Sequence, residues 1–373
     1  MEPLLDEHQQ SYQRSLRRFL EKEWGPDRLR AAMEGPTTLE RDVWRRLAFE
    51  LGVAGLNIPE HHGGSGEAHA EALLVIEELG RALFGPIYVG TVVLASQTLL
   101  LCEDESAQAA LFPGIADGTV TATLAWPDSG RDRTRAPLPR AVQSGSEWRL
   151  TGEVRRVVDG QSADRVLVVA NTDAGDSVFL LSGEDGLERL AGESIDPTRR
   201  LATLVLDDAP AVLVGTPGGA PSVLDRLRPF VALHLAAEAV GGAAACVDQT
   251  VSYAKTREQF GSPIGAFQAV KHRCADMQVR LEGARAGVRY AGQAIVTGEE
   301  DLDVLSSVLK VYATRSYFRS AADMVQLHGG IGFTWEHSAH LHFKRAKSLE
   351  LMAGSHDEHR ELIARAVLDR VGS

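Results

Sequence analysis

Two segments in the C-terminal part of the chain carry residue types suited to binding phosphate groups. Arg257 offers a planar, permanently charged guanidinium that matches phosphate oxygens. Gln268 and Gln326 each provide hydrogen-bond donors and acceptors. The pair Gly329 and Gly330 lets a backbone approach a ligand without an intervening Cβ. Taken singly, an Arg-Glu pair is typical of a solvated helix and Gly-Gly of a turn, so residue types alone leave both interpretations open.

Histidines near the C-terminus are the other candidates for chemistry. They are close in sequence and include His337, His340, His342, His356 and His359. Metal binding needs convergent ligands supported by further hydrogen bonds, and this spacing does not demand such a site. We interpret these histidines as the surface of a helix entry and predict no metal site.

Composition narrows the class of protein. The chain has 373 residues, 44% hydrophobic content and a formal net charge of −12. So acidic a surface disfavours nucleic acid, which is bound through clustered Lys and Arg. No run of eighteen apolar residues occurs and the N-terminus lacks the order of a signal peptide. We therefore expect no membrane association, a cytoplasmic location, and three small buried thiols at Cys102, Cys246 and Cys274.

The elements that must position these residues fall into three regions. Apolar residues recur at helical spacing from Leu16 to about Gly114, interrupted at residues 57–66 by Pro and Gly. Short β-rich runs separated by turn residues follow to Val214. After a Gly- and Pro-rich linker at 215–221, long helical patterns cover 224–253, 268–297 and 302–327.

This order predicts a mainly α protein with a β middle domain. We expect an N-terminal helical domain at 1–116, a small β-barrel or sandwich domain at 117–214, and a C-terminal four-helix bundle at 215–373.

Motifs from all three regions closely resemble those of acyl-CoA dehydrogenases. Residues 253–264 read YAKTREQFGSPI, followed by Phe267 and Gln268, and residues 326–334 read QLHGGIGFT. Residues 56–64 and 77–81 resemble the family's N-terminal helical domain, and residues 148–152 and 163–164 its β domain. The similarity extends from about residue 15 to 365.

The resemblance implies a flavoprotein that binds FAD and oxidises an acyl-CoA substrate between its α and β carbons, with an electron-transferring flavoprotein as acceptor. In the family, the two C-terminal motifs reach across a subunit interface and hold the neighbour's FAD, which implies an oligomer. The corresponding cofactor-binding residues here are Arg257, Phe260, Gln268, Gln326, Gly329, Gly330 and Gly332.

The catalytic base of the family has no counterpart at its known positions. The usual glutamate, which removes the α proton, corresponds to Ala353, and the alternative position on the first bundle helix corresponds to Val231. Glu350, His356 and Asp357 flank Ala353, but a displacement of three residues loses catalytic alignment. We interpret these three as a charged entry to the last helix, and Glu238 as a helix-packing residue.

The middle region departs from the family as well. A loop that cradles the flavin carries Ala125 and Arg131 where the family has Thr and Ser. An aromatic-Ile-Thr segment that stacks on and hydrogen-bonds the flavin is replaced by residues 156–159, which read RVVD. These changes remove groups that orient and tune the flavin ring.

The losses concern the chain's own flavin and base, while the residues that serve a neighbour's FAD are retained. The pattern resembles the base-lacking subunit of heteromeric α2β2 acyl-CoA dehydrogenases, some of which act on sterol side-chain esters; fatty acid β-oxidation is the wider family context. The alternatives are a self-sufficient homo-oligomer with a relocated base, a flavin monooxygenase of the same fold, and a scaffold without flavin.

Overall fold

The computed structural model describes residues 5–35, 38–66, 68–126, 137–145, 147–297 and 301–371. The chain forms two compact units, which are described separately. The first comprises Met1–Ala31, His69–Phe84 and Ala232–Ser373, and the second comprises Ala32–Ala68 and Gly85–Val231. The three domain boundaries expected from the sequence stay a prediction.

The first unit is helical. Its helices are α1 (Glu7–Glu23), most of α2 (Pro26–Glu34), α4 (His69–Arg81), the C-terminal part of α7 (Ala220–Thr256), α8 (Gln268–Thr297), α9 (Leu302–His328), α10 (Ala339–Leu351) and α11 (His356–Val371). Helix α9 packs against α8, α10 and α11, so the long helical patterns of the sequence form the expected C-terminal bundle.

Helix α1 illustrates how local sequence sets an element of this unit. The Asp6 side chain accepts a hydrogen bond from the backbone N–H of Gln9, and Gln9 returns one to Asp6, which forms a capping box. Leu16, Phe19 and Leu20 are buried at helical spacing, as the sequence predicts.

Two glycines let α4 and α7 approach closely. A Cβ at Gly241 would lie 1.7 Å from the carbonyl oxygen of Glu77, and one at Gly80 would lie 2.3 Å from that of Glu238. Any larger residue would push the helix backbones apart. This close approach places Glu238 in the interior, where it is 2% exposed.

Helix α7 is long and apolar enough to span a membrane, with a mean hydropathy of 1.7 in its most apolar window. In this structure 94% of that window is buried inside the protein. A helix that is hydrophobic all round is also what the core of a large protein requires.

The second unit contains helices and the β region. Its helical segments are the end of α2, α3 (Thr38–Leu51), a 3₁₀ turn η1 (Glu60–His62), a π-helical segment η2 (Val89–Ser96), α5 (Gln97–Cys102), α6 (Glu105–Ala116) and the N-terminal part of α7. Its strands are β1 (Ala122–Ala125), β2 (Arg140–Ser144), β3 (Glu147–Val158), β4 (Arg165–Thr172), β5 (Gly175–Leu181), β6 (Leu187–Ala191) and β7 (Leu201–Val214).

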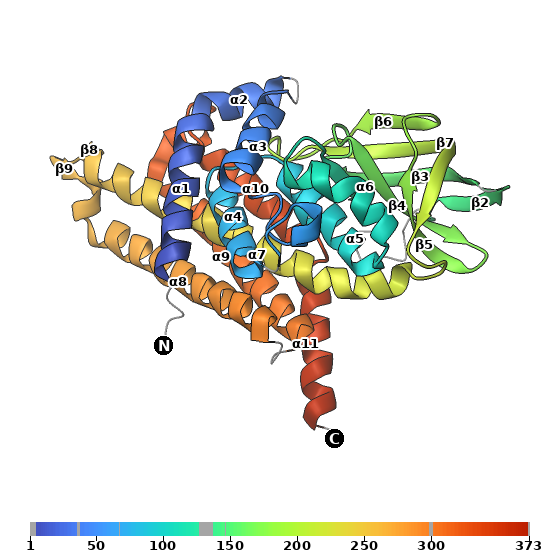
Figure 1. Cartoon of the computed structure of the whole chain (residues 1–373). Coiled ribbons are helices and arrows are strands. Elements are labelled where there is room, and N and C mark those ends of the chain that lie inside the picture. Colours follow the sequence, from blue (N-terminus) through green and yellow to red (C-terminus); the bar gives the residue numbers. More distant parts are fainter. Residues whose placement is uncertain are drawn as a thin grey trace. The chain divides into compact units, whose positions relative to one another are not determined.

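The strands close into a barrel. They pair in the order β1-β4-β2-β3-β7-β5, and β5 also pairs with β4, so the path returns on itself (Figure 1). Strand β6 adds to the edge of β7. The interior is filled by apolar side chains that include Leu150, Val168, Phe179 and Leu204. The expected fold class, mainly α with a β region before a C-terminal helical part, is confirmed.

The thiols differ from the expectation. Cys246 is buried, but Cys102 and Cys274 are partly exposed, so the prediction of three buried thiols is wrong for two of them. Burial raises the pKa of the Cys102 thiol to about 12, with a smaller contribution from Asp104, which keeps it protonated at neutral pH.

Candidate functional site

The two C-terminal motifs are brought together at one end of the helical unit. After α7 the chain forms a hairpin of β8 (Glu258–Gln259) and β9 (Ser262–Pro263), then a 3₁₀ turn η3 (Ile264–Ala266) that leads into α8 (Figure 1). The second motif ends α9 and forms the 3₁₀ turn η4 (Gly329–Phe333). Tyr253 joins them, because its ring stacks on His328 at 4.4 Å and its hydroxyl donates to the His328 carbonyl at 3.5 Å.

The polar groups of these motifs are available to a ligand. The side chains of Arg257, Gln268 and Gln326 are exposed, and none of them bonds to another residue in the described part of the chain. Gly329 and Gly330 are exposed, and a Cβ at either would meet open space. A free guanidinium and two free amides beside exposed backbone form a suitable cradle for phosphate and ribose oxygens.

The other two predicted cofactor residues differ in environment. Phe260 is 94% exposed at the hairpin turn, where its φ of 53° is left-handed, and its ring meets Phe267 edge-on at 6.2 Å. Gly332 is buried, and a Cβ there would lie 2.7 Å from the carbonyl oxygen of Val325. We infer that Phe260 is presented to something outside the chain, whereas Gly332 shapes η4.

His328 fixes the second motif from within. Its Nδ1–H donates to the Met324 carbonyl at 2.8 Å, and its ring lies between Tyr253 and His337. Its buried Nε2 has no hydrogen-bond partner among the described residues, and burial lowers the pKa of the ring. Sequence reasoning missed Tyr253 and His328; the signal was an aromatic residue four positions before Arg257 and a ring directly before Gly-Gly.

Ala353, which the resemblance predicts to stand at the family's usual base position, has a methyl side chain that cannot accept a proton. Its backbone is left-handed, with a φ of 54°, and its carbonyl accepts a hydrogen bond from His359 Nε2 at 2.9 Å. The other ring nitrogen of His359 lies 3.0 Å from the Ser307 hydroxyl, which donates to it. Burial, followed by the charge of Lys310, lowers the pKa of His359 to about 4, so the ring is neutral and holds the turn at Ala353.

The residues that flank Ala353, namely Glu350, His356 and Asp357, each have a polar partner within the chain. Lys347 donates to Glu350 at 2.8 Å, and His356 Nε2 lies 2.7 Å from the Thr314 hydroxyl oxygen. Asp357 is 92% exposed in its side chain and pairs with Arg360 at 3.1 Å. These contacts agree with a charged helix entry, although their exclusion as a relocated base stays a prediction.

The alternative base position is apolar and buried. Val231 on α7 is 2% exposed. Two turns further along, Glu238 pairs with Arg345 of α10 at 2.6 Å, and Arg345 also donates to the Phe84 carbonyl at 3.3 Å and 3.2 Å. The carboxylate is therefore committed to an interior ion pair, as a packing role for Glu238 requires.

The middle region offers few groups to a flavin among the described residues. Ala125 is buried in β1, and Val157 and Val158 are 3% and 6% exposed at the end of β3. Arg131 lies outside the described residues. Arg156 adopts a left-handed φ of 58° with an exposed side chain. Ala125, Arg156, Val157 and Val158 thus carry no hydroxyl or aromatic group that would orient a flavin ring.

Asp159 follows these valines and is buried at 1% exposure. One carboxylate oxygen accepts a hydrogen bond from the Ser162 hydroxyl, and the other has no partner among the described residues. Desolvation raises the pKa of this carboxyl to about 6, against lowering contributions from Ser162, Arg200 and Arg41 and a raising one from Asp164. Asp159 is therefore an internal acid of the β unit.

Replacing Asp159 with Asn is expected to change how stability depends on pH. The folded state keeps the proton up to about pH 6, whereas the unfolded chain loses it near pH 3.8, the ordinary pKa of an aspartate. The stabilisation is full below that value and disappears as the pH rises through 6. From pH 4 to pH 7, wild type should lose about 2–3 kcal/mol of unfolding free energy relative to Asp159→Asn. Urea titrations at both pH values measure this, with Asp173→Asn at an exposed turn as control. Parallel profiles for wild type and Asp159→Asn would contradict the assignment.

The C-terminal histidines are less exposed than expected. His342 is 1% exposed and its Nδ1 lies 2.8 Å from the Tyr317 hydroxyl, and His359 is 6% exposed. The expectation of a solvated surface is wrong for these two, because each ring is a hydrogen-bonding partner inside the bundle. His340 instead packs edge-on against Trp335 at 4.5 Å.

Comparison with known proteins decides the family. Residues 6–119 match the family described as "Acyl-CoA dehydrogenase, N-terminal domain", and residues 224–368 match "Acyl-CoA dehydrogenase, C-terminal domain". The chain belongs to the acyl-CoA dehydrogenase family. It is similar to the acyl-CoA dehydrogenase IpdE2 of Mycobacterium tuberculosis, with 35% identity over 91% of each chain. Membership makes the chain part of an oxidoreductase family.

Solved structures of heteromeric relatives share the fold. The chain aligns with one in the ChsE4-ChsE5 complex from Mycobacterium tuberculosis at a TM-score of 0.87 and 28% identity, covering 99% of both chains. It aligns with another in the Tcur3481-Tcur3483 steroid acyl-CoA dehydrogenase at a TM-score of 0.85 and 29% identity, covering 99% of this chain and 100% of that one.

Acyl-CoA dehydrogenase membership implies FAD, and the described residues fit one part of it. Three side chains, those of Arg257, Gln268 and Gln326, make no bond to the described residues, and the Gly329-Gly330 backbone is open. These groups suit the charged pyrophosphate and the ribose. The buried Val157 and Val158 do not supply ring-directed hydrogen bonds. The described residues therefore fit the pyrophosphate and ribose of FAD rather than its flavin ring.

Proposed function

We propose that this chain is the non-catalytic subunit of a FAD-dependent acyl-CoA dehydrogenase. It contributes the cross-interface half of a FAD site to a catalytic partner, in an α2β2 assembly that carries out α,β-dehydrogenation of an acyl-CoA thioester. The observation that carries the proposal is the contrast between two places in one helical unit. Arg257, Gln268 and Gln326 stand exposed and unbonded among the described residues, while Ala353 replaces the base.

In this proposal the chain's own residues bind and orient. The Arg257 guanidinium pairs with pyrophosphate oxygens, the two glutamines bond to ribose or phosphate, and Tyr253 with His328 keeps the two motifs in register. Exposed Phe260 packs on the partner subunit. When bound, FAD supplies the group that accepts the hydride. The partner supplies the carboxylate that removes the α proton.

The substrate class is proposed from the heteromeric relatives. The Tcur3481-Tcur3483 protein is described as a steroid acyl-CoA dehydrogenase, and this chain aligns with it over 99% of its length. We therefore propose a sterol-derived acyl-CoA as the substrate, a fatty acyl-CoA as the second candidate, an electron-transferring flavoprotein as the acceptor, and the cytoplasm as the location.

The isolated chain is expected neither to reduce FAD with an acyl-CoA nor to remove the substrate's α proton. Incubated with FAD and a panel of steroid and fatty acyl-CoA thioesters without oxygen, it should leave the flavin absorbance unchanged. In D₂O it should not exchange the substrate's α proton, because alanine and valine stand at the two positions that correspond to the family's base, Ala353 and Val231. The complex with its partner, co-expressed from an adjacent dehydrogenase-like gene, should do both.

The variant Glu350→Gln serves as the control for a relocated base. In the complex it should leave the rate of flavin reduction unchanged, because Glu350 is paired with Lys347. If the isolated chain reduces FAD with an acyl-CoA and Glu350→Gln abolishes that activity, the chain is a self-sufficient enzyme and the proposal fails.

A further inference from the structure

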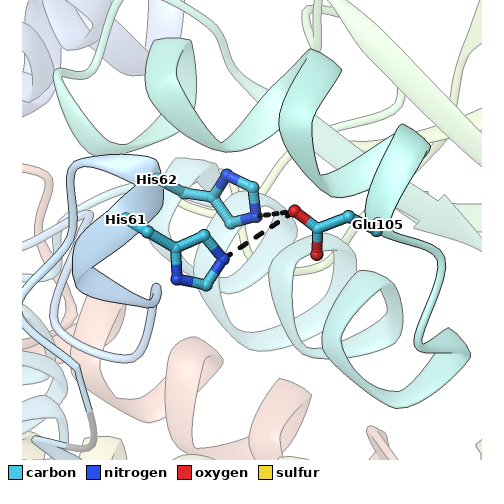
Figure 2. A group of neighbouring side chains, drawn as sticks. All are labelled: His61, His62 and Glu105. Atoms are coloured by element: carbon cyan, nitrogen blue, oxygen red, sulfur yellow. Dashed lines mark ion pairs between the residues drawn. The ribbon is translucent and has the colours of Figure 1, made fainter.

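A second cluster with ligand chemistry lies in the β-containing unit. It consists of His61 and His62 on η1 and Glu105 in the first turn of α6. One ligand atom from each residue lies within 4.8 Å of the others. Figure 2 shows both imidazole rings turned toward the same carboxylate. Two imidazoles and a carboxylate are a donor set that divalent late first-row metals prefer.

The distances within the cluster suit a shared ion. Glu105 Oε1 lies 3.3 Å from His62 Nε2 and 3.8 Å from His61 Nε2. Ligand atoms about 2.1 Å from a tetrahedral zinc ion are roughly 3.4 Å apart. The three ligand atoms lie within 4.8 Å of one another. The side chains of His61 and Glu105 are 65% and 72% exposed, so they are free to move closer around one ion.

Hydrogen bonding does not account for this arrangement. His62 is 6% exposed, and its buried Nε2 forms no hydrogen bond with any described residue although it faces Glu105. The contact with Glu105 is an ion pair without hydrogen-bond geometry, and a metal ion between the two groups would bond to both (Figure 2). The His61 ring lies against it at 4.1 Å and brings a second nitrogen to the same oxygen.

The η1 side of the cluster is held by backbone hydrogen bonds and by packing of the His62 ring. The backbone N–H of His62 donates to the Pro59 carbonyl at 3.0 Å, and that of Gly63 donates to the Glu60 carbonyl at 2.9 Å. Gly64 fits only as glycine, since a Cβ would lie 2.0 Å from the Ile58 carbonyl oxygen. The His62 ring packs at 5.5 Å on Phe112, which lies two turns after Glu105 on α6. His62 is thus set in place before any ion binds, and the exposed side chains of His61 and Glu105 complete the site around it.

We propose that His61, His62 and Glu105 form a binding site for a divalent late transition-metal ion, with zinc as the representative. Solvent or one further donor completes the coordination. The ion ties η1 to the start of α6 within this unit, and the site is independent of the flavin.

Calorimetric titration of the full-length, untagged chain with ZnCl₂ tests the proposal. Wild type should bind one equivalent saturably, and its melting temperature should rise with zinc. His61→Ala and Glu105→Gln should each weaken binding by at least ~10-fold, because each removes a direct ligand. Cobalt(II) should give visible absorption that both variants lose. His61 and Glu105 are chosen for substitution because their side chains are exposed. Truncation of the buried His62 would also disturb packing.

The controls are His272→Ala and Glu188→Gln, which remove the same groups from exposed positions elsewhere. They should bind zinc as wild type does. Wild-type protein without saturable zinc binding, or His61→Ala and Glu105→Gln variants that bind zinc as tightly as these controls, would overturn the proposal.

Discussion

Replacement of Arg345 by alanine is expected to lower the free energy of unfolding by about 3–5 kcal/mol, a large part of the stability of a typical domain. Arg345 is 0% exposed, its ion pair with Glu238 is 2.6 Å long, and it also donates to the Phe84 carbonyl. Removing the guanidinium leaves the Glu238 carboxylate in the interior without its cation. Chemical denaturation followed by circular dichroism measures the change.

A double variant separates the ion pair from simple loss of volume. Glu238→Gln combined with Arg345→Met removes both charges and keeps most of the packed volume, so it should be less destabilised than Arg345→Ala. The matched control is Arg360→Ala. Its partner Asp357 is exposed, so the loss should be below about 0.5 kcal/mol. Equal losses for Arg345→Ala and Arg360→Ala would contradict a structural role for the buried pair.

Replacement of Arg257 by alanine in this chain is expected to weaken FAD binding by the two-subunit complex by ~10–100-fold, because a bidentate charge-assisted contact to phosphate is lost. The side chain of Arg257 makes no bond to the described residues, so its removal should leave the fold intact. Flavin fluorescence on dilution of the complex gives the dissociation constant of FAD. An unchanged melting temperature of the isolated variant shows that its fold is intact.

Two variants test whether shape or charge matters at Arg257. Arg257→Lys keeps the charge but loses the planar fork, so its affinity for FAD should be intermediate. Lys255→Ala removes an exposed positive charge two residues away and should leave the affinity nearly unchanged. If Arg257→Ala and Lys255→Ala have the same effect, Arg257 is a general surface charge rather than a ligand of the cofactor.

Long periodic segments were predictable from sequence because their signal is local. Helical spacing predicts residues 302–327, and α9 runs Leu302–His328. The runs at 165–169 and 177–181 lie within β4 and β5. The short strands β2 and β6 were not predicted, because both are largely exposed and lack alternating apolar residues. The linker expected at 215–221 is shorter, since α7 begins at Ala220.

The candidate sites show where local patterns stop being informative. The motif around Arg257 was found from residue types and resemblance, but its link to η4 depends on Tyr253 and His328, 75 residues apart. Likewise, His62 and Glu105 meet only because η1 packs against α6. Helical or strand periodicity in the sequence does not predict contacts between residues so far apart. The absence of the family's base stays a prediction, made from the resemblance of the segment around Ala353.

The most direct measurement for the central claim is the number of FAD molecules per chain in the purified two-subunit complex. Absorbance of released flavin and quantitative amino-acid analysis provide the two quantities. If this chain holds the FAD of its partner and has no flavin of its own, the complex contains one FAD for every two chains, and the isolated chain contains none. One FAD per chain, or a full complement in the isolated chain, would contradict the account.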